Sequence, residues 1–411
     1  MLGWEYPPHI AGGLGVACEG IVRALVDRGH RIHFVVPALY GDETARDFVL
    51  SDARLLAPVP GGEGSLQTSR YAAHLLPYGE AAATDVHAMP WASTAEGRSS
   101  GSPAVQYSRN LLMEVASYAE RVSAGLAGES FDLIHAHDWM TMPAGMAIKR
   151  RTGRPLVVHV HSLEFDRAGE HGNAAIVDVE RRGLTEADLV IAVSDYTKSI
   201  VCGQYGVSAE KVCVVHNGIY PLEATDYQAD PLFGNRPVVL FLGRVTYQKG
   251  PDYFVRAADI VRRFLPDTLF VVAGAGDLLA STIEMVHALG LERHVLFTGF
   301  LKGADVERAY AASSLYVMPS VSEPFGLTAL EAVRAGVPCI LSKQSGVSEV
   351  VRHSLRVDFW DVERLADLMI NALRSPELRR QLVEMSMKEV SRMRWDASAA
   401  LLEEAYGRFA A

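Results

Sequence analysis

Two cations stand close together in a segment that follows a short apolar run. Arg244 and Lys249 lie within residues 243–250, directly after the run at residues 238–242. Arginine offers a planar fork of hydrogen-bond donors and lysine a compact charge, so together they could bind the oxygens of a diphosphate. The alternative is two solvated cations on an exposed turn. We favour anion binding, because the segment follows the first expected strand of the second half of the chain.

Two carboxylates, Glu323 and Glu331, lie around the expected start of a helix. A proline and a glycine between them mark a turn, and residues 327–335 are predicted to be helical. Glu323 therefore precedes the helix, whereas Glu331 lies more than one turn inside it. Backbone N–H groups of residues 325–328, at the helix N-terminus, could stabilise the negative leaving group of a transfer reaction. In the alternative, Glu323 only complements the helix dipole and Glu331 is an exposed helical residue.

A glycine-rich segment, Gly12-Gly13-Leu14-Gly15, opens the helix expected over residues 16–28. Glycine lets a backbone approach a phosphate, and a helix N-terminus presents free N–H groups to it. A tight turn without a ligand is the alternative, because one glycine-rich loop is weak evidence. The segment comes so early that either the first strand is very short or the native start lies upstream.

Polar side chains also follow two expected strands of the first half. His161 and Glu164 come after the apolar run at residues 156–160, and His137 and Asp138 come after the preceding run. Polar groups at the ends of buried strands cost free energy unless they are hydrogen-bonded or used. His161 and Glu164 are therefore site candidates, while a satisfied structural role is the alternative for His137. No H-E-x-x-H or comparable spacing occurs, so no metal site is expected.

The elements that position these residues follow from short apolar runs, which alternate with amphipathic helical stretches in two successive series. Continuous apolar strands separated by helices are typical of parallel sheets covered on both faces. The pattern predicts two doubly wound α/β domains, whose ligands bind beyond the carboxyl ends of the strands. The runs are 32–36, 133–136, 156–160, 189–193 and 212–215 in the first series, and 238–242, 268–273, 295–299, 315–318 and 339–342 in the second.

The predicted organisation has four parts. An N-terminal domain covers residues 1–220, a linker 221–236, a C-terminal domain 237–391 and a terminal helix 392–411. The linker has prolines near both ends and no periodicity. Residues 60–101, rich in Gly, Ala and Ser, interrupt the first domain and are expected to form a β-excursion or a loop.

Composition narrows the class of protein. With 411 residues, 49% of them hydrophobic and 21% charged, the chain is expected to be globular with more than one core. The net charge of −10 opposes a nucleic-acid partner. The basic run at residues 149–154 is expected to be a helix C-terminus, with contact to an anionic surface as the alternative. Four cysteines without a C-x-x-C pair suggest a reducing cytoplasm, and no apolar stretch reaches the length of a membrane span.

Taken in order, the glycine-rich segment, Arg244 with Lys249, and Glu323 with Glu331 resemble the retaining glycosyltransferases of family 4. The resemblance runs over essentially the whole chain, and residues 161–169 and 194–198 look like those of glycogen synthase relatives. It implies the GT-B fold, an α/β architecture of two Rossmann-like domains facing across a cleft. The terminal helix would then cross back to the first domain, and no cofactor is implied.

The resemblance also implies roles for residues. The C-terminal domain would bind a nucleotide diphosphate-sugar (a UDP-, ADP- or GDP-sugar), and the N-terminal domain would hold a carbohydrate acceptor. Arg244 and Lys249 would neutralise the diphosphate in place of a metal ion. Glu323 would bind the transferred sugar, Glu331 the ribose hydroxyls, and His161 would lie near the anomeric carbon. The implied catalytic set is His161, Glu323, Arg244 and Lys249; the donor contacts are Gly12, Gly13, Leu14, Gly15, Gly243, Arg244, Lys249, Phe300, Leu301, Glu323, Phe325, Gly326, Leu327, Thr328 and Glu331; the acceptor-side residues are His137, Asp138 and Glu164.

One departure bears on the substrate. Bacterial glycogen synthases that this chain resembles carry Lys two residues before the paired glycines, whereas Ile10 stands there in this sequence. ADP-glucose and an α-glucan acceptor therefore stay open. Three alternatives also stay open: a sugar-nucleotide epimerase, a glycoside phosphorylase of the same architecture, and a non-catalytic sugar-binding subunit.

Overall fold

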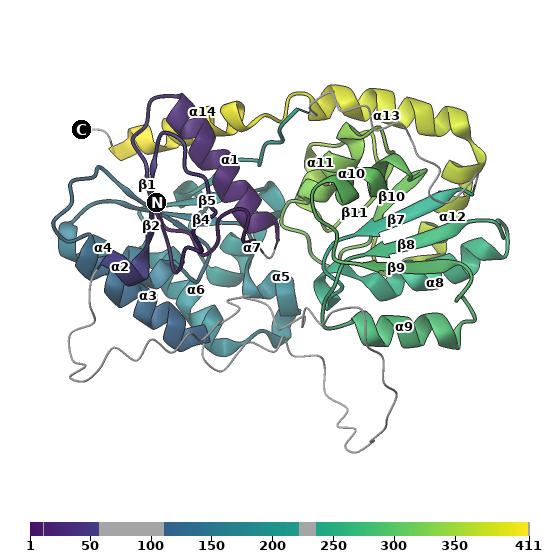
Figure 1. Ribbon diagram of the computed structural model, residues 1–411, viewed down its shortest axis with the longest axis horizontal. Helices are drawn as coiled ribbons and strands as arrows, with labels where there is room; N and C mark the ends of the chain where they lie inside the picture. Colours follow the sequence, from purple (N-terminus) through teal and green to yellow (C-terminus); the bar gives the residue numbers. More distant parts are fainter. Residues whose placement is uncertain (11, 57–110, 222–235, 410–411) are drawn as a thin grey trace, which may run out of the picture.

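The computed structural model describes all residues except 11, 57–110, 222–235 and 410–411. The segment expected at residues 60–101 and most of the expected linker therefore lie outside the described residues. Two lobes stand side by side, the first built from residues before the linker and the second from residues after it (Figure 1). Among the described residues, no helix combines the length and the apolar character needed to cross a bilayer.

The N-terminal lobe contains parallel strands buried by helices on both faces. Strands β3 (Ile134–His137), β4 (Leu156–Val160), β5 (Leu189–Ala192) and β6 (Val212–Val214) form a sheet in that order. Strands β1 (His33–Val36) and β2 (Val49–Asp52) form a parallel pair. Leu2 bridges both Val35 of β1 and Ala136 of β3, so the expected short first strand is reduced to single bridges that join the two groups. The helices are α1 (Gly13–Asp27), α2 (Ala53–Leu56), α3 (Leu111–Gly125), α4 (Met142–Thr152), α5 (Glu164–Ala168), α6 (Ala174–Glu186) and α7 (Asp195–Tyr205).

The C-terminal lobe is a six-stranded parallel sheet in the order β12-β11-β10-β7-β8-β9. Its strands are β7 (Val238–Leu242), β8 (Leu269–Ala273), β9 (Val295–Gly299), β10 (Leu315–Met318), β11 (Cys339–Ser342) and β12 (Leu355–Val357). The strand order reverses between β7 and β10, and such a switch point is where open α/β sheets bind their ligands. The helices are α8 (Pro251–Arg262), α9 (Leu279–Ala288), α10 (Ala304–Ala311), α11 (Leu327–Arg334), α12 (Val362–Arg374) and α13 (Pro376–Val390).

The last helix, α14 (Trp395–Tyr406), lies on the N-terminal lobe (Figure 1). Trp395 and Leu402 belong to the same buried cluster as the apolar face of α1. A Cβ atom on Gly20 of α1 would lie 2.2 Å from the Trp395 ring, so glycine allows the two helices to pack closely. Arg28 donates to Glu403 and Asp396 of α14 and adds a charged rim to this contact.

All ten apolar runs are strands whose ends differ from the predicted ends by at most one residue. The α/β prediction is therefore confirmed. Strands β2 and β12 were not predicted, because each is short and lies at one end of its group, where burial is partial. All four cysteines are free thiols.

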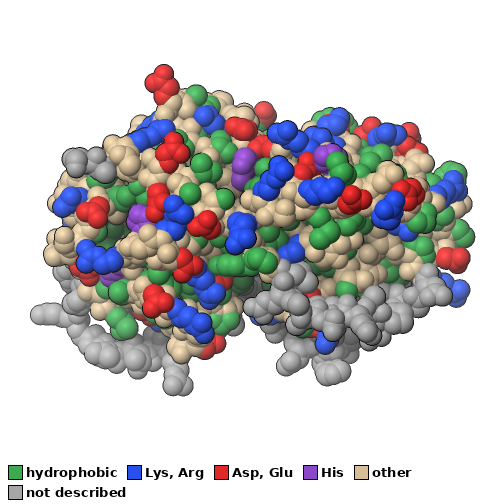
Figure 2. Space-filling model, turned by 90° about the horizontal axis from the view of Figure 1, so that it is seen from above, with side chains coloured by type: hydrophobic (Ala, Val, Ile, Leu, Met, Phe, Trp, Pro, Cys, Tyr) green, Lys and Arg blue, Asp and Glu red, His purple; other side chains and the backbone are tan. Residues whose placement is uncertain are grey.

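The surface charges are mixed. On the face shown in Figure 2, Lys and Arg side chains are interspersed with Asp and Glu and do not gather into one basic stripe. The basic run of α4 is paired: Lys149 contacts Asp188, and Arg150 contacts Glu186. The helix ends at Thr152 because Gly153 adopts a left-handed conformation with φ of 70°.

Candidate active site

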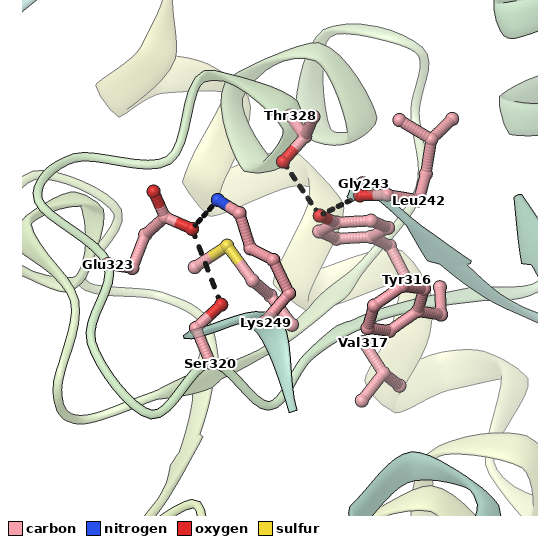
Figure 3. A pocket seen from close by; sticks show the side chains of 10 residues that line it. Leu242, Gly243, Lys249, Tyr316, Val317, Ser320, Glu323 and Thr328 are labelled. Carbon is pink, nitrogen blue, oxygen red and sulfur yellow. Dashed lines mark hydrogen bonds and ion pairs between the residues drawn. The ribbon is translucent and has the colours of Figure 1, made fainter. Parts of the chain in front are cut away.

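Lys249 and Glu323, one of the predicted cations and one of the predicted carboxylates, meet at the switch point of the C-terminal sheet. A pocket there is lined by Gly243 after β7, by Ser320 and Glu323 after β10, and by Lys249 and Thr328 (Figure 3). Lys249 ends the 3-10 turn η3 (Tyr247–Lys249), and the left-handed Gly250, with φ of 66°, turns the chain into α8. Two loops far apart in sequence thus form one wall of the site.

Lys249 and Glu323 form an ion pair in which the Lys249 Nζ donates to Glu323 Oε2. Ser320 Oγ donates to the same oxygen at 3.3 Å. The Glu323 side chain is 7% exposed and that of Lys249 is 20% exposed, so the pair lies in a partly dehydrated place. A charge pair in such surroundings interacts more strongly than one on an open surface. The carboxylate at the mouth of the site is therefore oriented before any ligand binds.

Arg244 lies on the same loop as Lys249. Its guanidinium donates to the Gln248 Oε1 at 3.2 Å, and Gln248 is the buried neighbour of Lys249. The loop backbone is fixed, because the N–H groups of Gly243 and Val245 donate to the carbonyls of Ala273, at the end of β8, and of Ala275, just after it. The structure thus brings Lys249 and Glu323 to one site and places Arg244 on the loop that carries Lys249.

Backbone hydrogen bonds hold the Glu323 segment from within its own domain. The N–H of Glu323 donates to the Gln344 carbonyl at 2.9 Å, and the Gly346 N–H donates to the Glu323 carbonyl at 2.9 Å. Side chains of the N-terminal lobe hold its neighbours. Ser322 Oγ donates to Asp166 Oδ1 at 2.6 Å, and Ser194 Oγ donates to the Pro324 carbonyl at 2.6 Å. Both lobes therefore fix the position of the Glu323 carboxylate.

Glu349 makes a second contact between the lobes that sequence reasoning missed. It ends the 3-10 turn η4 (Gly346–Glu349), and its carboxylate accepts from the backbone N–H groups of Asp195 and Tyr196 at the N-terminus of α7. His216 lies 3.1 Å from the same carboxylate. Burial opposes the charge, but the hydrogen bonds from His216 and the two amides outweigh it and lower the pKa of Glu349. A carboxylate at a helix N-terminus is a common stabilising arrangement, yet nothing in the local sequence indicates a partner helix in the other domain.

The glycine-rich segment faces the start of α11. Gly12 precedes α1, Gly13 is exposed at its first position, and a Cβ atom there would lie 3.7 Å from Leu327 of α11. The left-handed Gly326, with φ of 110°, allows α11 to begin directly after the Glu323 turn. Two helix N-termini, one from each lobe, therefore meet beside the ion pair, and Leu14 is half-buried behind them.

Gly15 has a different role from the predicted donor contact. Its N–H donates to the Glu5 Oε1 at 2.9 Å, so it is already occupied. A Cβ atom at this position would lie 2.3 Å from Cγ2 of Ile10. Close packing of the segment that enters α1 explains this glycine, and its predicted donor contact is wrong in this arrangement.

The remaining predicted donor contacts lie along the same edge of the sheet. Glu331 is half-buried in α11, where Tyr310 Oη donates to its Oε2 at 3.0 Å and burial raises its pKa. Thr328 accepts from Tyr316 Oη at 2.8 Å. Phe300 follows β9 and is 53% exposed, and its neighbour Leu301 packs against the domain core. Phe325 is buried, so only its backbone faces a ligand.

His161 directly follows β4, and its ring contacts His137. Asp138 Oδ1 accepts from the backbone N–H groups of His161 and Ser162, at 2.7 and 3.2 Å. The segment after His161 continues into α5, which packs against η3 and so against the turn that carries Lys249. Burial lowers the pKa of His161 to about 3, so its imidazole is neutral at pH 7.

His137 and Asp138 are buried rather than open to an acceptor. His137 is 0% exposed, and its Nδ1 lies 2.9 Å from the Nε2 of His161. Asp138 is 2% exposed, and burial raises its pKa to about 6. The predicted acceptor contacts of these residues are therefore corrected to a positioning role: they hold the His161 loop.

Glu164 is also corrected. It is 1% exposed, lies 3.6 Å from the Arg167 guanidinium and accepts from the Asn173 N–H at 2.9 Å. Its own N–H donates to Glu180, which also accepts from Tyr205 Oη. The chain turns inward after β4, so this carboxylate stabilises the loop from inside and does not reach the cleft.

Comparisons with known proteins agree with this architecture. Residues 12–218 match the family model for the glycosyl transferase 4-like domain, and residues 224–389 match that for glycosyl transferases group 1. The chain belongs to the glycosyltransferases built from these two domains, and its fold is GT-B.

Two individual relatives match most of this chain at modest sequence identity. An uncharacterized glycosyltransferase of Methanocaldococcus jannaschii is 29% identical over 369 residues, which cover 86% of this chain and 83% of the relative. A glycogen synthase of Mycobacterium tuberculosis is 25% identical over 375 residues, which cover 85% of this chain and 79% of the relative.

Solved structures share the fold over the whole chain. Sucrose-phosphate synthase from Thermosynechococcus elongatus superposes with a TM-score of 0.74 at 21% identity, covering 99% of this chain and 97% of that one. Anabaena HepE, in complex with UDP and glucose, superposes with a TM-score of 0.69 at 19% identity, covering 99% of this chain and 98% of that one. At these identities the likeness concerns the fold.

Proposed function

We propose that this glycosyltransferase moves a hexosyl group from a nucleotide diphosphate-sugar to a hydroxyl of a carbohydrate or similar acceptor, with retention of configuration and without a metal ion. The observation that carries the proposal is the ion pair of Lys249 and Glu323 at the switch point, with Arg244 on the same loop as Lys249 and the exposed Gly13 near the start of α11. Two fixed cations beside a carboxylate provide both a site for a diphosphate and a hydrogen-bond acceptor for a sugar.

Each group has a role in this chemistry. As the bond between the anomeric carbon and the diphosphate breaks, negative charge grows on the leaving oxygen. Lys249 and Arg244 stabilise that charge together with the N–H groups at the start of α11. Because these charges are held in place beforehand, they need little rearrangement during the reaction.

Glu323 and His161 act on the sugar side. The Glu323 carboxylate accepts hydrogen bonds from sugar hydroxyls, and the ion pair with Lys249 couples the sugar subsite to the diphosphate subsite. His161, neutral because of its burial, offers a hydrogen bond near the anomeric carbon without adding a repulsive charge. Departure of the diphosphate and attack of the acceptor on the same face give retention. The residues thus position and stabilise charge and need not supply a strong nucleophile.

The donor base and the acceptor are proposed only as classes. Anabaena HepE binds UDP, and the M. tuberculosis relative is a glycogen synthase, so UDP- and ADP-sugars with α-glucan and small-sugar acceptors are the first to test. Ile10 stands where the bacterial glycogen synthases carry Lys. A test with ADP-glucose as the donor therefore shows whether this chain uses that donor without the lysine.

The test combines binding and turnover. UDP-, ADP- and GDP-sugars are screened by the shift in melting temperature, which reports binding to the folded state. The best donor is then incubated with acceptors, and the product anomer is read by NMR. A product with the donor's configuration is expected. An inverted anomer contradicts the proposed retention; isomerisation of the donor without acceptor, turnover only with free phosphate, or no nucleotide release with any donor contradicts the proposed transfer.

A further inference from the structure

Four histidines form a compact array on one face of the N-terminal sheet. His135 and His137 lie two positions apart on β3, and His159 and His161 lie two positions apart on and just after β4. The rings of His135 and His137 stack at 4.3 Å between centroids, and so do those of His159 and His161. The proposed transfer uses only the last of these rings.

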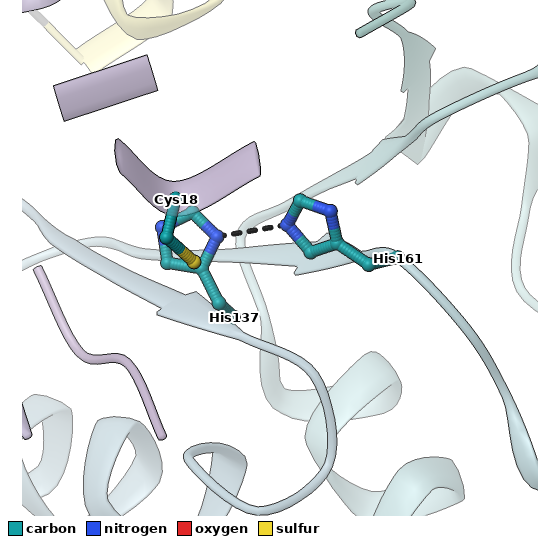
Figure 4. Close-up of side chains that lie close together, drawn as sticks. All are labelled: Cys18, His137 and His161. Atoms are coloured by element: carbon teal, nitrogen blue, oxygen red, sulfur yellow. Dashed lines mark hydrogen bonds between the residues drawn. The ribbon is translucent and has the colours of Figure 1, made fainter. Parts of the chain in front are cut away.

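Helix α1 places a thiol against this array. Cys18 is 0% exposed, and one ligand atom each from Cys18, His137 and His161 lies within 4.8 Å of the others. His137 and His161 face each other across 2.9 Å, with the Cys18 sulfur beside the His137 ring (Figure 4). This group was not predicted from the sequence, because Cys18 lies far from both histidines along the chain.

The hydrogen bonding of these rings is incomplete. Within the described part of the chain, the buried His137 Nε2 and His161 Nδ1 have no hydrogen-bond partner. A buried polar atom without a partner costs about 1–3 kcal/mol. These two atoms are the ring nitrogens that take no part in the His137–His161 contact.

We propose that Cys18, His137 and His161 form a binding site for a transition-metal ion of the zinc type. Imidazole nitrogen with thiolate sulfur is a ligand set that suits zinc, whereas magnesium and calcium favour oxygen ligands. Tetrahedral zinc with Zn–N distances of about 2.0–2.1 Å needs the two nitrogens about 3.3 Å apart. The facing nitrogens are 2.9 Å apart, so a small rotation of the rings admits the ion.

Charge and access also suit a cation. On binding, the Cys18 thiol loses its proton to water and supplies a thiolate, so two neutral imidazoles and one negative charge surround the ion. Beyond burial, the negative charges of Glu5 and Asp138 act on the Cys18 thiol and raise its pKa, and the same charges attract a cation. His161 is only partly buried, whereas Cys18 and His137 are fully buried, so an ion reaches the group from the His161 side.

Among the residues that the structure describes, two other groups compete as metal sites. His135, His137 and His159 form a fully buried triad without sulfur, and the mostly exposed His9, Asp42 and Glu43 form another cluster. Neither combines a thiolate with a partly buried histidine. These clusters provide the controls.

The consequence for activity rests on the proposed function, which places His161 beside the sugar. An ion that occupies a ring nitrogen of His161 removes its hydrogen bond to the donor. We therefore expect micromolar-range zinc to inhibit transfer and a chelator to restore it, although catalysis itself requires no metal.

The experiment titrates the reduced full-length protein with Co²⁺ and then displaces the cobalt with Zn²⁺. A thiolate-bound cobalt ion has a charge-transfer absorption band that imidazole and carboxylate ligands do not give. The band is expected in the wild-type protein, is lost in Cys18→Ser, and persists in Cys213→Ser. Affinity falls at least about tenfold in His161→Gln, since even loss of an outer partner of a metal ligand costs that much. It is unchanged in His9→Ala.

Each outcome decides the proposal. A cobalt band that survives in Cys18→Ser, binding abolished in His9→Ala, or no band at millimolar cobalt would overturn the site. Thermal melting of each metal-free variant shows whether a lost band reflects unfolding, and His161→Gln gives a second test if Cys18→Ser does not fold. Zinc inhibition is compared with each variant's own metal-free rate. A cobalt band in a protein that transfers no sugar would contradict the proposed function and leave the metal site standing.

Discussion

Glu349 of the C-terminal lobe accepts a hydrogen bond from the backbone N–H of Tyr196 in the N-terminal lobe, at 2.7 Å. The contact caps α7, and it lies in the same turn whose Gly346 N–H donates to the Glu323 carbonyl. One carboxylate therefore links the relative position of the lobes to the segment that carries the proposed sugar ligand.

We expect Glu349→Ala to weaken catalysis through this link. Loss of a charged helix cap costs about 1–2 kcal/mol. Because the cap holds the two lobes in the arrangement that forms the site, this loss corresponds to a fall in kcat/KM of about 5–30-fold. Steady-state kinetics with the best donor measures it. Exposed Glu284 on α9 gives the matched control, Glu284→Ala, and equal rates for both variants would show that the contact does not position the site.

Replacing either partner of the central ion pair is expected to abolish most turnover. Loss of one preorganised charge stabiliser costs about 100–1,000-fold in rate, so Lys249→Ala and Glu323→Gln should each lose that much in kcat/KM. Because the two act as one unit, the double variant should lose little more than the worse single variant. Both variants should melt cooperatively near the wild-type temperature. Near-normal rates in folded variants would remove these residues from the site.

Chelation separates the proposed mechanism from metal-assisted transfer. Since Arg244 and Lys249 supply the positive charge, transfer should continue after dialysis against EDTA. The assay needs zinc-free buffers, because zinc bound at the Cys18 site would otherwise inhibit transfer. Loss of activity that Mg²⁺ or Mn²⁺ restores would contradict the mechanism and leave the fold assignment unchanged.

Gly13 and Gly15, the two glycines in the first turn of α1, should differ when each is changed to alanine. A Cβ atom on Gly15 meets Ile10 at 2.3 Å, so Gly15→Ala is expected to lower the free energy of unfolding by about 1–3 kcal/mol through overpacking. A Cβ atom on Gly13 has room, with Leu327 at 3.7 Å. Gly13→Ala should therefore keep its stability but bind the donor more weakly, as measured by denaturant unfolding and donor titration. The reverse pattern would exchange their roles.

Glu180 should make stability depend on pH. Burial raises its pKa to about 8, well above its usual value of 4.5, so between these values the folded protein keeps a proton that the unfolded chain releases. The free energy of unfolding then falls as pH rises, by up to about 1.4 kcal/mol per pH unit. The Glu180→Gln variant has no titrating carboxyl at this position. Its free energy of unfolding relative to wild type should therefore rise from pH 5 to pH 8.

Urea unfolding across that pH range measures the difference. The exposed Asp178 of the same helix gives a control, Asp178→Asn, which should parallel the wild-type curve. Parallel curves for Glu180→Gln and wild type would show that Glu180 is ionised in the folded protein at neutral pH.

Sequence predicted the parts of the site that depend on strand ends. Continuous apolar runs located the strands, and the rule that ligands bind beyond their carboxyl ends pointed to Arg244, Lys249 and Glu323. The structure brings Lys249 and Glu323 together because β7 and β10 are neighbours. The pattern of apolar residues locates the strands and their ends, and this inference needed nothing more.

The residues that sequence missed or misassigned depend on tertiary direction. Glu164 follows a strand end as His161 does, but α5 turns its side chain inward to Arg167. Glu349 reaches a helix of the other lobe, and Cys18 meets its histidines only because α1 packs across the sheet. No local pattern encodes which way such a side chain points, since burial, not periodicity, decides it.

The position of α14 has consequences for folding during translation and for cutting the chain into its two lobes. Trp395, Leu402 and Ala405 complete a buried apolar cluster whose members outside α14 lie mainly in α1 and in or next to strands β1, β4, β5 and β6, all synthesised before residue 216. During translation, the N-terminal lobe leaves the ribosome with that surface uncovered. Fragments cut at the linker should for the same reason aggregate unless α14 is supplied, for instance as a covalently joined peptide.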